Sequence, residues 1–381
     1  MQRDPAALKG ALAELEQRQL TRTRRVMPRA GLTNFCSNDY LGLAAHPDVV
    51  RAFTEAAARH GVGSGASHLV TGHGIEHEAL EQELAAFTGR EKALVFSTGY
   101  MANMGVIDAL ADQKSLIVSD KLNHASLIDG CRLSGAQTRR YPHADAVRAA
   151  ELIAKATPDA HTRLLITDGV FSMDGDLAPL PELAPAARAA KAWLVVDDAH
   201  GLGVVGATGR GSCEHFGLGA DDVPVLIGTF GKAFGTFGAF VAGDADLIEF
   251  LLQKARTYIF TTALPPAVAA ATRAALAVSE RESWRREKVL ALARRLREGL
   301  AARGIAPGTG GATAIQPIVL GSEARALAAS RSLEDKGFMV SAIRPPTVPA
   351  GTARLRITLS AAHEESQVDA LLDALAQVLA A

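Results

Sequence analysis

The stretch Thr229-Phe230-Gly231-Lys232-Ala233-Phe234-Gly235 decides how the rest of the chain is interpreted. It follows the apolar run 224–228, which predicts a buried strand, and it sets one lysine among small and apolar residues. A lysine with such neighbours loses hydration, which lowers its pKa and leaves a neutral amine that can attack a carbonyl group. The alternative interpretation is a strand end from which one lysine reaches solvent.

Two further stretches carry polar side chains where a strand is predicted to stop. The apolar run from Trp193 ends in Asp197 and Asp198, and strand alternation places these two carboxylates on opposite faces. A carboxylate at the end of a buried strand needs a cationic partner, which the protonated ring nitrogen of pyridoxal phosphate can supply. His124 follows the predicted strand 115–120, where an imidazole can stack on a flat cofactor. Taken singly, each of these residues also fits a purely structural role.

The composition excludes several classes of protein. With 381 residues, 48% of them hydrophobic, the chain is long enough for two or three domains around a large core. It has no apolar run of about 18 residues that could span a membrane, and its N-terminal residues resemble neither a signal nor a transit peptide, so we expect a cytoplasmic protein. Three scattered cysteines show no C-x-x-C spacing, and a net charge of −1 gives no basis for binding nucleic acid. Small molecules are the expected partners.

The order of predicted elements indicates an α/β fold. Strands and helices alternate from residue 93 to residue 198, which predicts a mostly parallel sheet with helices on both faces. A long helical region is predicted from residue 266 to about residue 303, and strands near 315–320, 339–344 and 353–359 alternate with helices beyond it. The C-terminal part is therefore expected to form a smaller α+β domain.

A phosphate site is predicted where the strand 93–97 runs into a helix at Gly99 and Tyr100. The free N–H groups and the dipole at a helix N-terminus favour an anion, and ligands of parallel sheets bind at the carboxyl ends of the strands. The hydroxyl of Thr229, at the end of another predicted strand, is expected to assist.

Two motifs suggest other functions but lack the required context. The run Gly201–Gly206 matches the G-x-G-x-x-G fingerprint of dehydrogenases, yet the residues after it are too rich in glycine to open the helix that dinucleotide binding needs. The run His73-Gly74-Ile75-Glu76-His77 matches an H-x-x-E-H zinc motif, but it begins in a glycine loop, so its imidazoles need not share a helix face. We assign no metal site.

Several motifs, in this order along the chain, resemble those of the α-oxoamine synthases, which are pyridoxal-phosphate enzymes of fold type I. The motifs are Ser37–Leu43, Asn123–Ser126, Asp168–Gly175, Asp197–Gly201 and Thr229–Lys232. The stretch 342–356 is similar to the branch that condenses L-alanine with a pimeloyl thioester in biotin synthesis. Members of the family that use glycine share the lysine, aspartate and histidine motifs and remain the main alternative. A nucleotide-binding dehydrogenase is a remote alternative.

The resemblance implies three segments and a cofactor site. The segments are an N-terminal helix and strand in 1–36, a large pyridoxal-phosphate-binding domain in 37–265 and the small domain in 266–381. The implied cofactor-binding residues are Gly99, Tyr100, His124, Ser172, Asp197, His200, Thr229 and Lys232, joined by Thr261 and Thr262, which are expected to reach the phosphate in the partner subunit of a homodimer.

The same resemblance implies the catalytic roles. Lys232 would hold the cofactor as a Schiff base and then remove the Cα proton of alanine, while Asp197 keeps the ring nitrogen protonated. His124 would stack on the ring. Ser172 and His200 would bind its phenolic oxygen.

The implied substrate-binding residues are Arg22, Asn38, His124, Arg344, Thr347 and Arg356. Arg22 belongs to the arginine cluster Arg18–Arg29, and the match to the family leaves open whether Arg22 or a neighbouring arginine faces the substrate. The alternative is that the whole cluster is the solvent-exposed end of a helix. Arg356 would clamp the carboxylate of the amino acid with two hydrogen bonds. Its alternative is a strand arginine paired with a glutamate. Whether the acyl carrier is coenzyme A or an acyl carrier protein stays open.

Overall fold

The computed structural model describes residues 5–18, 20–24, 26–27, 31–155, 160–311 and 313–380, and the chain divides into two compact units. The larger unit consists of Asn38–Leu290 with Ser360–Ala362, and the smaller unit of Met1–Ser37, Ala291–Leu359 and His363–Ala381. This division differs from the predicted segments in that the N-terminal segment is grouped with the C-terminal one. The helix after residue 265 also falls in the larger unit.

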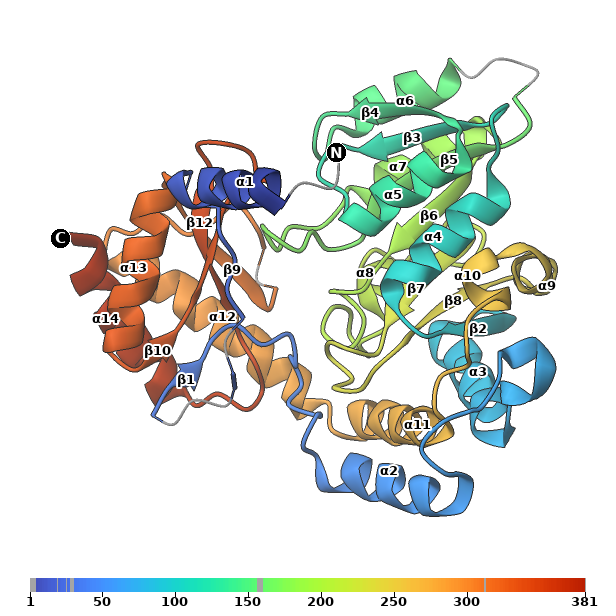
Figure 1. The fold of residues 1–381 in the computed structure, drawn as a ribbon, viewed down its shortest axis with the longest axis horizontal. Helices are drawn as coiled ribbons and strands as arrows, with labels where there is room; N and C mark the ends of the chain where they lie inside the picture. The colour runs from blue at the N-terminus through green and yellow to red at the C-terminus, as the bar shows by residue number, and fades with distance from the viewer. Residues whose placement is uncertain are drawn as a thin grey trace. The chain divides into compact units, whose positions relative to one another are not determined.

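A seven-stranded sheet forms the centre of the larger unit (Figure 1). Its order is β2-β8-β7-β6-β5-β3-β4, and β8 runs antiparallel to both of its neighbours while the other pairs are parallel. The strands are β2 (Lys92–Phe96), β3 (Leu116–Asp120), β4 (Gln137–Tyr141), β5 (Arg163–Asp168), β6 (Trp193–Asp197), β7 (Val225–Thr229) and β8 (Ala239–Gly243). The predicted mixed, mostly parallel sheet is confirmed.

Helices cover both faces of this sheet, because successive strand residues alternate between two hydrophobic cores (Figure 1). One core contains Val195 and Ile227, and the other contains Val196 and Leu226. The first core is covered by α4 (Gly99–Leu110), α5 (Ala125–Ser134), α9 (Ala245–Lys254) and α10 (Arg256–Ile259); the second by α6 (Ala146–Ala154), α7 (Leu180–Ala189) and α8 (Gly211–His215).

Three more helices belong to the larger unit, and α2 (Pro47–His60) and α3 (Ile75–Thr88) both pack on α11 (Pro266–Arg281). Pro47 occupies the first turn of α2, and Gly61 follows its end with φ +81°. A short π-helix, η1 (His68–Gly72), lies between α2 and α3. The predicted helical region 266–303 is interrupted where Glu282 leaves the helical conformation, with φ −108° and ψ 58°.

The smaller unit is an α+β structure, as predicted. Its three-stranded antiparallel sheet has the order β11-β12-β9, and a separate parallel pair joins β1 to β10. The strands are β1 (Thr33–Asn34), β9 (Ile315–Gly321), β10 (Phe338–Met339), β11 (Ser341–Ile343) and β12 (Ala353–Thr358); the helices are α1 (Pro5–Gln17), α13 (Glu323–Asp335), α14 (Glu365–Ala380) and the later part of α12 (Trp284–Ala302). Among the described helices, none is long and apolar enough to cross a membrane.

Candidate active site

A cavity of about 190 Å³ lies in the larger unit, where β5, β6 and β7 end side by side. It contains all eight cofactor-site residues that the sequence predicted for a single subunit. Its lining consists of Gly99, Tyr100, Asn103, His124, Ser126, Asp168, Val170, Ser172, Asp197, Ala199, His200, Thr229 and Lys232. The position at the carboxyl ends of parallel strands agrees with the general location of ligand sites in α/β sheets.

Asp197 is held at the end of β6 by two hydrogen bonds. The amide Nδ2 of Asn103, on α4, donates to Asp197 Oδ2 at 2.6 Å, and the backbone N–H of Ala199 donates to Oδ1 at 3.1 Å. Asp198 points to the opposite side, where the backbone N–H of Ser212 donates to its Oδ2 at 2.6 Å. The predicted alternation of the two carboxylates is therefore confirmed.

A second buried carboxylate, Asp168, lies at the end of the neighbouring strand β5 and is paired in register with Asp197. Burial raises the pKa of Asp168 well above its usual range, and the charge of Asp197 raises it further, whereas the N–H of His124 and the charge of Lys232 lower it. Two adjacent buried carboxylates favour a positive charge between them. The floor of the cavity is thus suited to a cationic group.

His124 caps α5, and its Nδ1 lies 2.7 Å from Ser126 Oγ. Burial lowers the pKa of His124, as does the charge of Lys232, whereas Asp197 raises it. The ring therefore favours the neutral form, which suits a residue that stacks on an aromatic cofactor. His200 Nδ1 lies 2.7 Å from the hydroxyl of Tyr40, which fixes the orientation of the second imidazole.

The predicted phosphate site lies at the N-terminus of α4. Thr98 caps this helix, because its hydroxyl accepts the N–H of Met101 at 3.2 Å, so the N–H groups of Gly99 and Tyr100 lie in the uncapped first turn beside the cavity. The Thr229 hydroxyl donates its proton to Gly238 O at 2.9 Å. It must exchange this bond before it can donate to a phosphate.

The other predicted residues lie outside this cavity. Thr262 pairs with Ser67 in an isolated bridge, and neither Thr261 nor Thr262 lines the cavity. Asn38 Oδ1 accepts a hydrogen bond from the Tyr40 hydroxyl at 3.1 Å. Asn38 is therefore linked to His200 through Tyr40. These positions leave the predicted roles of the three residues untested.

The predicted substrate residues of the smaller unit are brought together in part. Arg22, Arg344 and Thr347 line one cavity of about 730 Å³, which Arg331 also borders. Arg344 Nη2 donates to Thr21 O at 3.3 Å. Arg356 lies buried on β12, where its cross-strand neighbours are Ser341 and Pro317 and not a glutamate. Of the arginine cluster, Arg25 and Arg29 lie outside the described residues.

Sequence reasoning did not select four polar residues at or beside the large-unit cavity: Tyr40, Asn103, Ser126 and Asp168. Asn103 lies one helical turn after Gly99, so helix periodicity from the predicted phosphate site could have indicated it. Asp168 could have been found by aligning the ends of the predicted parallel strands. The contact between Tyr40 and His200 joins residues 160 positions apart and has no local signal.

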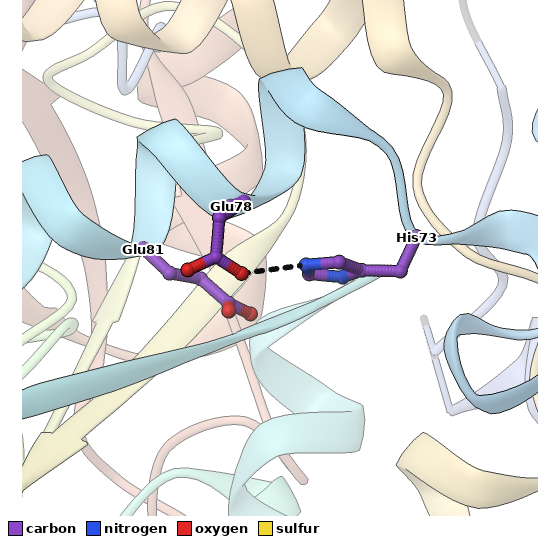
Figure 2. Close-up of side chains that lie close together, drawn as sticks. All are labelled: His73, Glu78 and Glu81. Carbon is purple, nitrogen blue, oxygen red and sulfur yellow. Dashed lines mark hydrogen bonds and ion pairs between the residues drawn. The ribbon is translucent and has the colours of Figure 1, made fainter.

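The structure rejects the two alternative motifs. Turns follow Gly201–Gly206, and the next helix, α8, has only five residues, so the dinucleotide fingerprint lacks its helix. In the H-x-x-E-H motif, His77 uses both ring nitrogens: Nδ1 accepts the N–H of Gly74, so Nε2 carries the proton and donates to Leu264 O. Glu76 forms an ion pair with Arg273 at 2.7 Å. The nearby side chains of His73, Glu78 and Glu81 do point toward one another (Figure 2).

Comparisons with known proteins identify the family of this chain. The family model for aminotransferase class I and II matches residues 30–375. A curated relative from Methylococcus capsulatus, named 8-amino-7-oxononanoate synthase, is 60% identical over 99% of this chain and 98% of its own length. A second relative of that name, from Saccharophagus degradans, is 59% identical over 91% of this chain and 87% of its own length.

Solved structures of similar proteins cover nearly the whole chain. A serine palmitoyltransferase from S. paucimobilis, with a bound PLP-myriocin aldimine, has a TM-score of 0.92 at 32% identity and covers 99% of this chain and 98% of its own. An 8-amino-7-oxononanoate synthase from Francisella tularensis has a TM-score of 0.80 at 29% identity and covers 92% of this chain and 98% of its own.

Proposed function

The chain belongs to the aminotransferase class I and II family, and we propose that it catalyses the decarboxylative condensation of L-alanine with a pimeloyl thioester. The products are 8-amino-7-oxononanoate, carbon dioxide and the free carrier thiol, which is an acyl-transfer step of biotin biosynthesis. The observation that carries this proposal is the relative of 60% identity, whose name states that product and whose alignment spans both chains almost completely.

Pyridoxal phosphate is the cofactor, and the large-unit cavity has the donors and charges that this molecule needs. The N–H groups at the start of α4 suit its phosphate. Two buried carboxylates, Asp168 and Asp197, suit its cationic ring nitrogen. The amine of Lys232 lines the same cavity and is placed to hold the aldehyde carbon. When bound, the cofactor supplies an electron sink for the negative charge that develops at the amino-acid Cα.

Within this proposal Lys232 moves protons at the amino-acid Cα. Its amine removes the Cα proton of alanine so that this carbon can attack the thioester carbonyl, and the thiol then leaves. Asp197 retains the proton on the ring nitrogen, and Asn103 and Ala199 prevent that carboxylate from turning away. His124, which favours the neutral form, packs on the ring face without adding a competing charge.

His200 and Ser172 would hydrogen-bond the phenolic oxygen of the cofactor, with Nε2 of His200 as the ring nitrogen that faces it. The Tyr40 hydroxyl, 2.7 Å from His200 Nδ1, fixes the imidazole so that its Nε2 has one direction only. We assign Tyr40 to positioning His200, because it does not line the cavity itself. The first turn of α4, with Thr229, binds the phosphate.

We further propose that the cavity of the smaller unit binds an anionic part of the acyl substrate. Two guanidinium groups that border it, those of Arg22 and Arg331, together with Arg344, suit the free carboxylate of the pimeloyl chain or the phosphates of its carrier. Thr347 adds a hydroxyl to the same wall. The clamping role of Arg356 and the assisting role of Asn38 stay predictions from the family resemblance.

The assembly is proposed to be a homodimer in which Thr261 and Thr262 reach the cofactor phosphate of the partner subunit. Their absence from the lining of their own cavity is compatible with this arrangement. The carrier of the pimeloyl group is proposed to be coenzyme A or an acyl carrier protein.

We expect the enzyme to prefer L-alanine with pimeloyl-CoA over glycine with acetyl-CoA by at least about two orders of magnitude in kcat/KM, which is about 2.7 kcal/mol of transition-state discrimination. Each buried methylene group of the longer chain contributes roughly 0.8 kcal/mol where the wall is already formed, and the prolines around Thr347 stiffen that wall. Thiol release measured with each pair of substrates tests the expectation. Comparable turnover with glycine and acetyl-CoA would leave the cofactor chemistry intact but would contradict the substrate assignment.

A further inference from the structure

Three side chains that can bind metal ions gather where the chain enters α3, and none of them lines the catalytic cavity. His73 lies in the segment before the helix, and Glu78 and Glu81 lie one turn apart on α3 (Figure 2). One ligand atom from each residue lies within 4.8 Å of the other two. The group therefore combines an imidazole with two carboxylates that face a common point.

One pair in the group already has the spacing of two ligands of one small ion. Zinc bonds of about 2.0–2.2 Å at tetrahedral angles place two ligand atoms about 3.3–3.6 Å apart. His73 Nε2 and Glu78 Oε2 lie 3.3 Å apart. The Glu78 side chain is 61% exposed, so it can rotate to complete the approach of the three ligands without disturbing the core.

A second histidine fixes the ring of His73 in the orientation that a metal ligand needs. His73 Nδ1 lies 3.0 Å from Nδ1 of His68, which is buried and stacked on Tyr258 at a centroid distance of 4.8 Å. The ring of His68 can accept a hydrogen bond from His73 Nδ1 at this distance. When Nδ1 carries the ring proton, the Nε2 lone pair is available to a metal ion on the side of the carboxylates, in place of the hydrogen bond that Nε2 donates to Glu78 without an ion. Metal-binding histidines are commonly oriented by such a hydrogen bond from the other ring nitrogen.

The charges of the cluster also favour a cation. Throughout the described ranges, neither Glu78 nor Glu81 forms an ion pair with a lysine or an arginine. Glu81 is half-buried, and its Oε1 accepts the backbone N–H of Val95 at 2.8 Å, which holds the carboxylate in place. Glu76, by contrast, is neutralised by Arg273. Within the described residues, neither carboxylate is therefore already neutralised by a lysine or an arginine.

We propose that His73, Glu78 and Glu81 bind one divalent transition-metal ion, with zinc as the best match to this set of one nitrogen and two oxygen ligands. Water completes the coordination on the exposed side of Glu78. The bound ion would tie the segment that holds His73 to α3. The site shares only His73 with the H-x-x-E-H motif, whose Glu76 and His77 are both occupied by other partners.

The test is calorimetric titration of Zn²⁺ into the chelator-treated, pyridoxal-phosphate-loaded protein, with Co²⁺ as a spectroscopic probe of the ligand geometry. We expect one saturable Zn²⁺ site per chain, in addition to any Zn²⁺ that the cofactor itself binds. The variants His73→Ala and Glu81→Gln should each weaken this site at least tenfold, because losing a ligand costs at least as much as losing the hydrogen bond that orients one, about 10–100-fold.

His161→Ala is the matched control. His161 also forms an ion pair with a carboxylate, Asp112, at 2.9 Å, but no third ligand joins them in the described part of the chain. This variant should bind Zn²⁺ as the wild type does. The proposal is overturned if the wild type shows no saturable site, or if His73→Ala retains the wild-type affinity. The exposed fraction of the His73 side chain, 26%, makes that variant a usable test even if Glu81→Gln fails to fold.

Discussion

Replacing Lys232 by alanine should lower kcat for the condensation of alanine with pimeloyl-CoA by at least about four orders of magnitude, because the change removes both the covalent anchor of the cofactor and the base that takes the Cα proton. The rest of the cavity, including the first turn of α4 and Asp197, is unchanged by the substitution, so the variant should still bind pyridoxal phosphate noncovalently. Thiol release measures the rate. Borohydride reduction followed by mass analysis of peptides measures the covalent attachment, which should be found at Lys232 in the wild type alone.

Lys254→Ala is the control for the effect of replacing a lysine outside the cavity. Lys254 is exposed at the end of α9 and lies outside the cavity, so this variant should keep the wild-type rate and attachment. The assignment of Lys232 fails if Lys232→Ala retains more than a small fraction of the wild-type rate, or if the reduced cofactor is found on another lysine.

Asp197→Asn should slow the condensation at least about a hundredfold while the cofactor stays bound, because a neutral amide cannot retain the proton on the ring nitrogen. The fold can accept the change. The Oδ1 atom of Asn103 has no hydrogen-bond partner, so a flip of the Asn103 amide lets it accept from the new side-chain amide. Steady-state rates and the content of bound cofactor, measured on the same preparation, separate the loss of chemistry from the loss of binding.

Asp198→Asn is the matched control one residue later. Asp198 faces Ser212, away from Asp197, and its substitution should change kcat less than about tenfold. Burial raises the pKa of Asp198 to about 7. The native state therefore binds more protons than the unfolded state between about pH 4 and pH 7, and the wild type loses stability as the pH rises through this window. Asparagine does not titrate, so the free energy of unfolding of Asp198→Asn should increase relative to the wild type from pH 5 to pH 8. A larger kinetic effect for Asp198→Asn than for Asp197→Asn would contradict the assigned roles.

The sequence predicted the parts of the fold that depend on local rules. Strand alternation placed Asp197 and Asp198 on opposite faces, and the helix N-terminus after β2 was predicted from one apolar run followed by Gly99. The long helical region predicted after residue 265 is also present, as α11 and α12. These signals are local because they follow from the repeat of each element, 2.0 or 3.6 residues.

The remaining features depend on contacts between distant segments. Asp198 lies where the chain passes through Gly169, Gly201 and Gly211, and a Cβ atom at any of these glycines would come within 2.4 Å of its carboxylate. No local sequence pattern near Asp198 predicts this packing. The joining of Arg22 to Arg344 in one cavity is of the same kind, because more than 300 residues separate them. Such sites follow from the topology of the chain and not from its periodicity.

The most direct test of the proposed reaction uses L-alanine labelled with ¹³C in its carboxyl group, together with pimeloyl-CoA and the pyridoxal-phosphate-loaded protein. The account predicts one labelled carbon dioxide for each thiol released, and an unlabelled 8-amino-7-oxononanoate that keeps the other two carbons of alanine. Thiol release without labelled carbon dioxide, or a product that retains the label, would contradict the decarboxylative condensation.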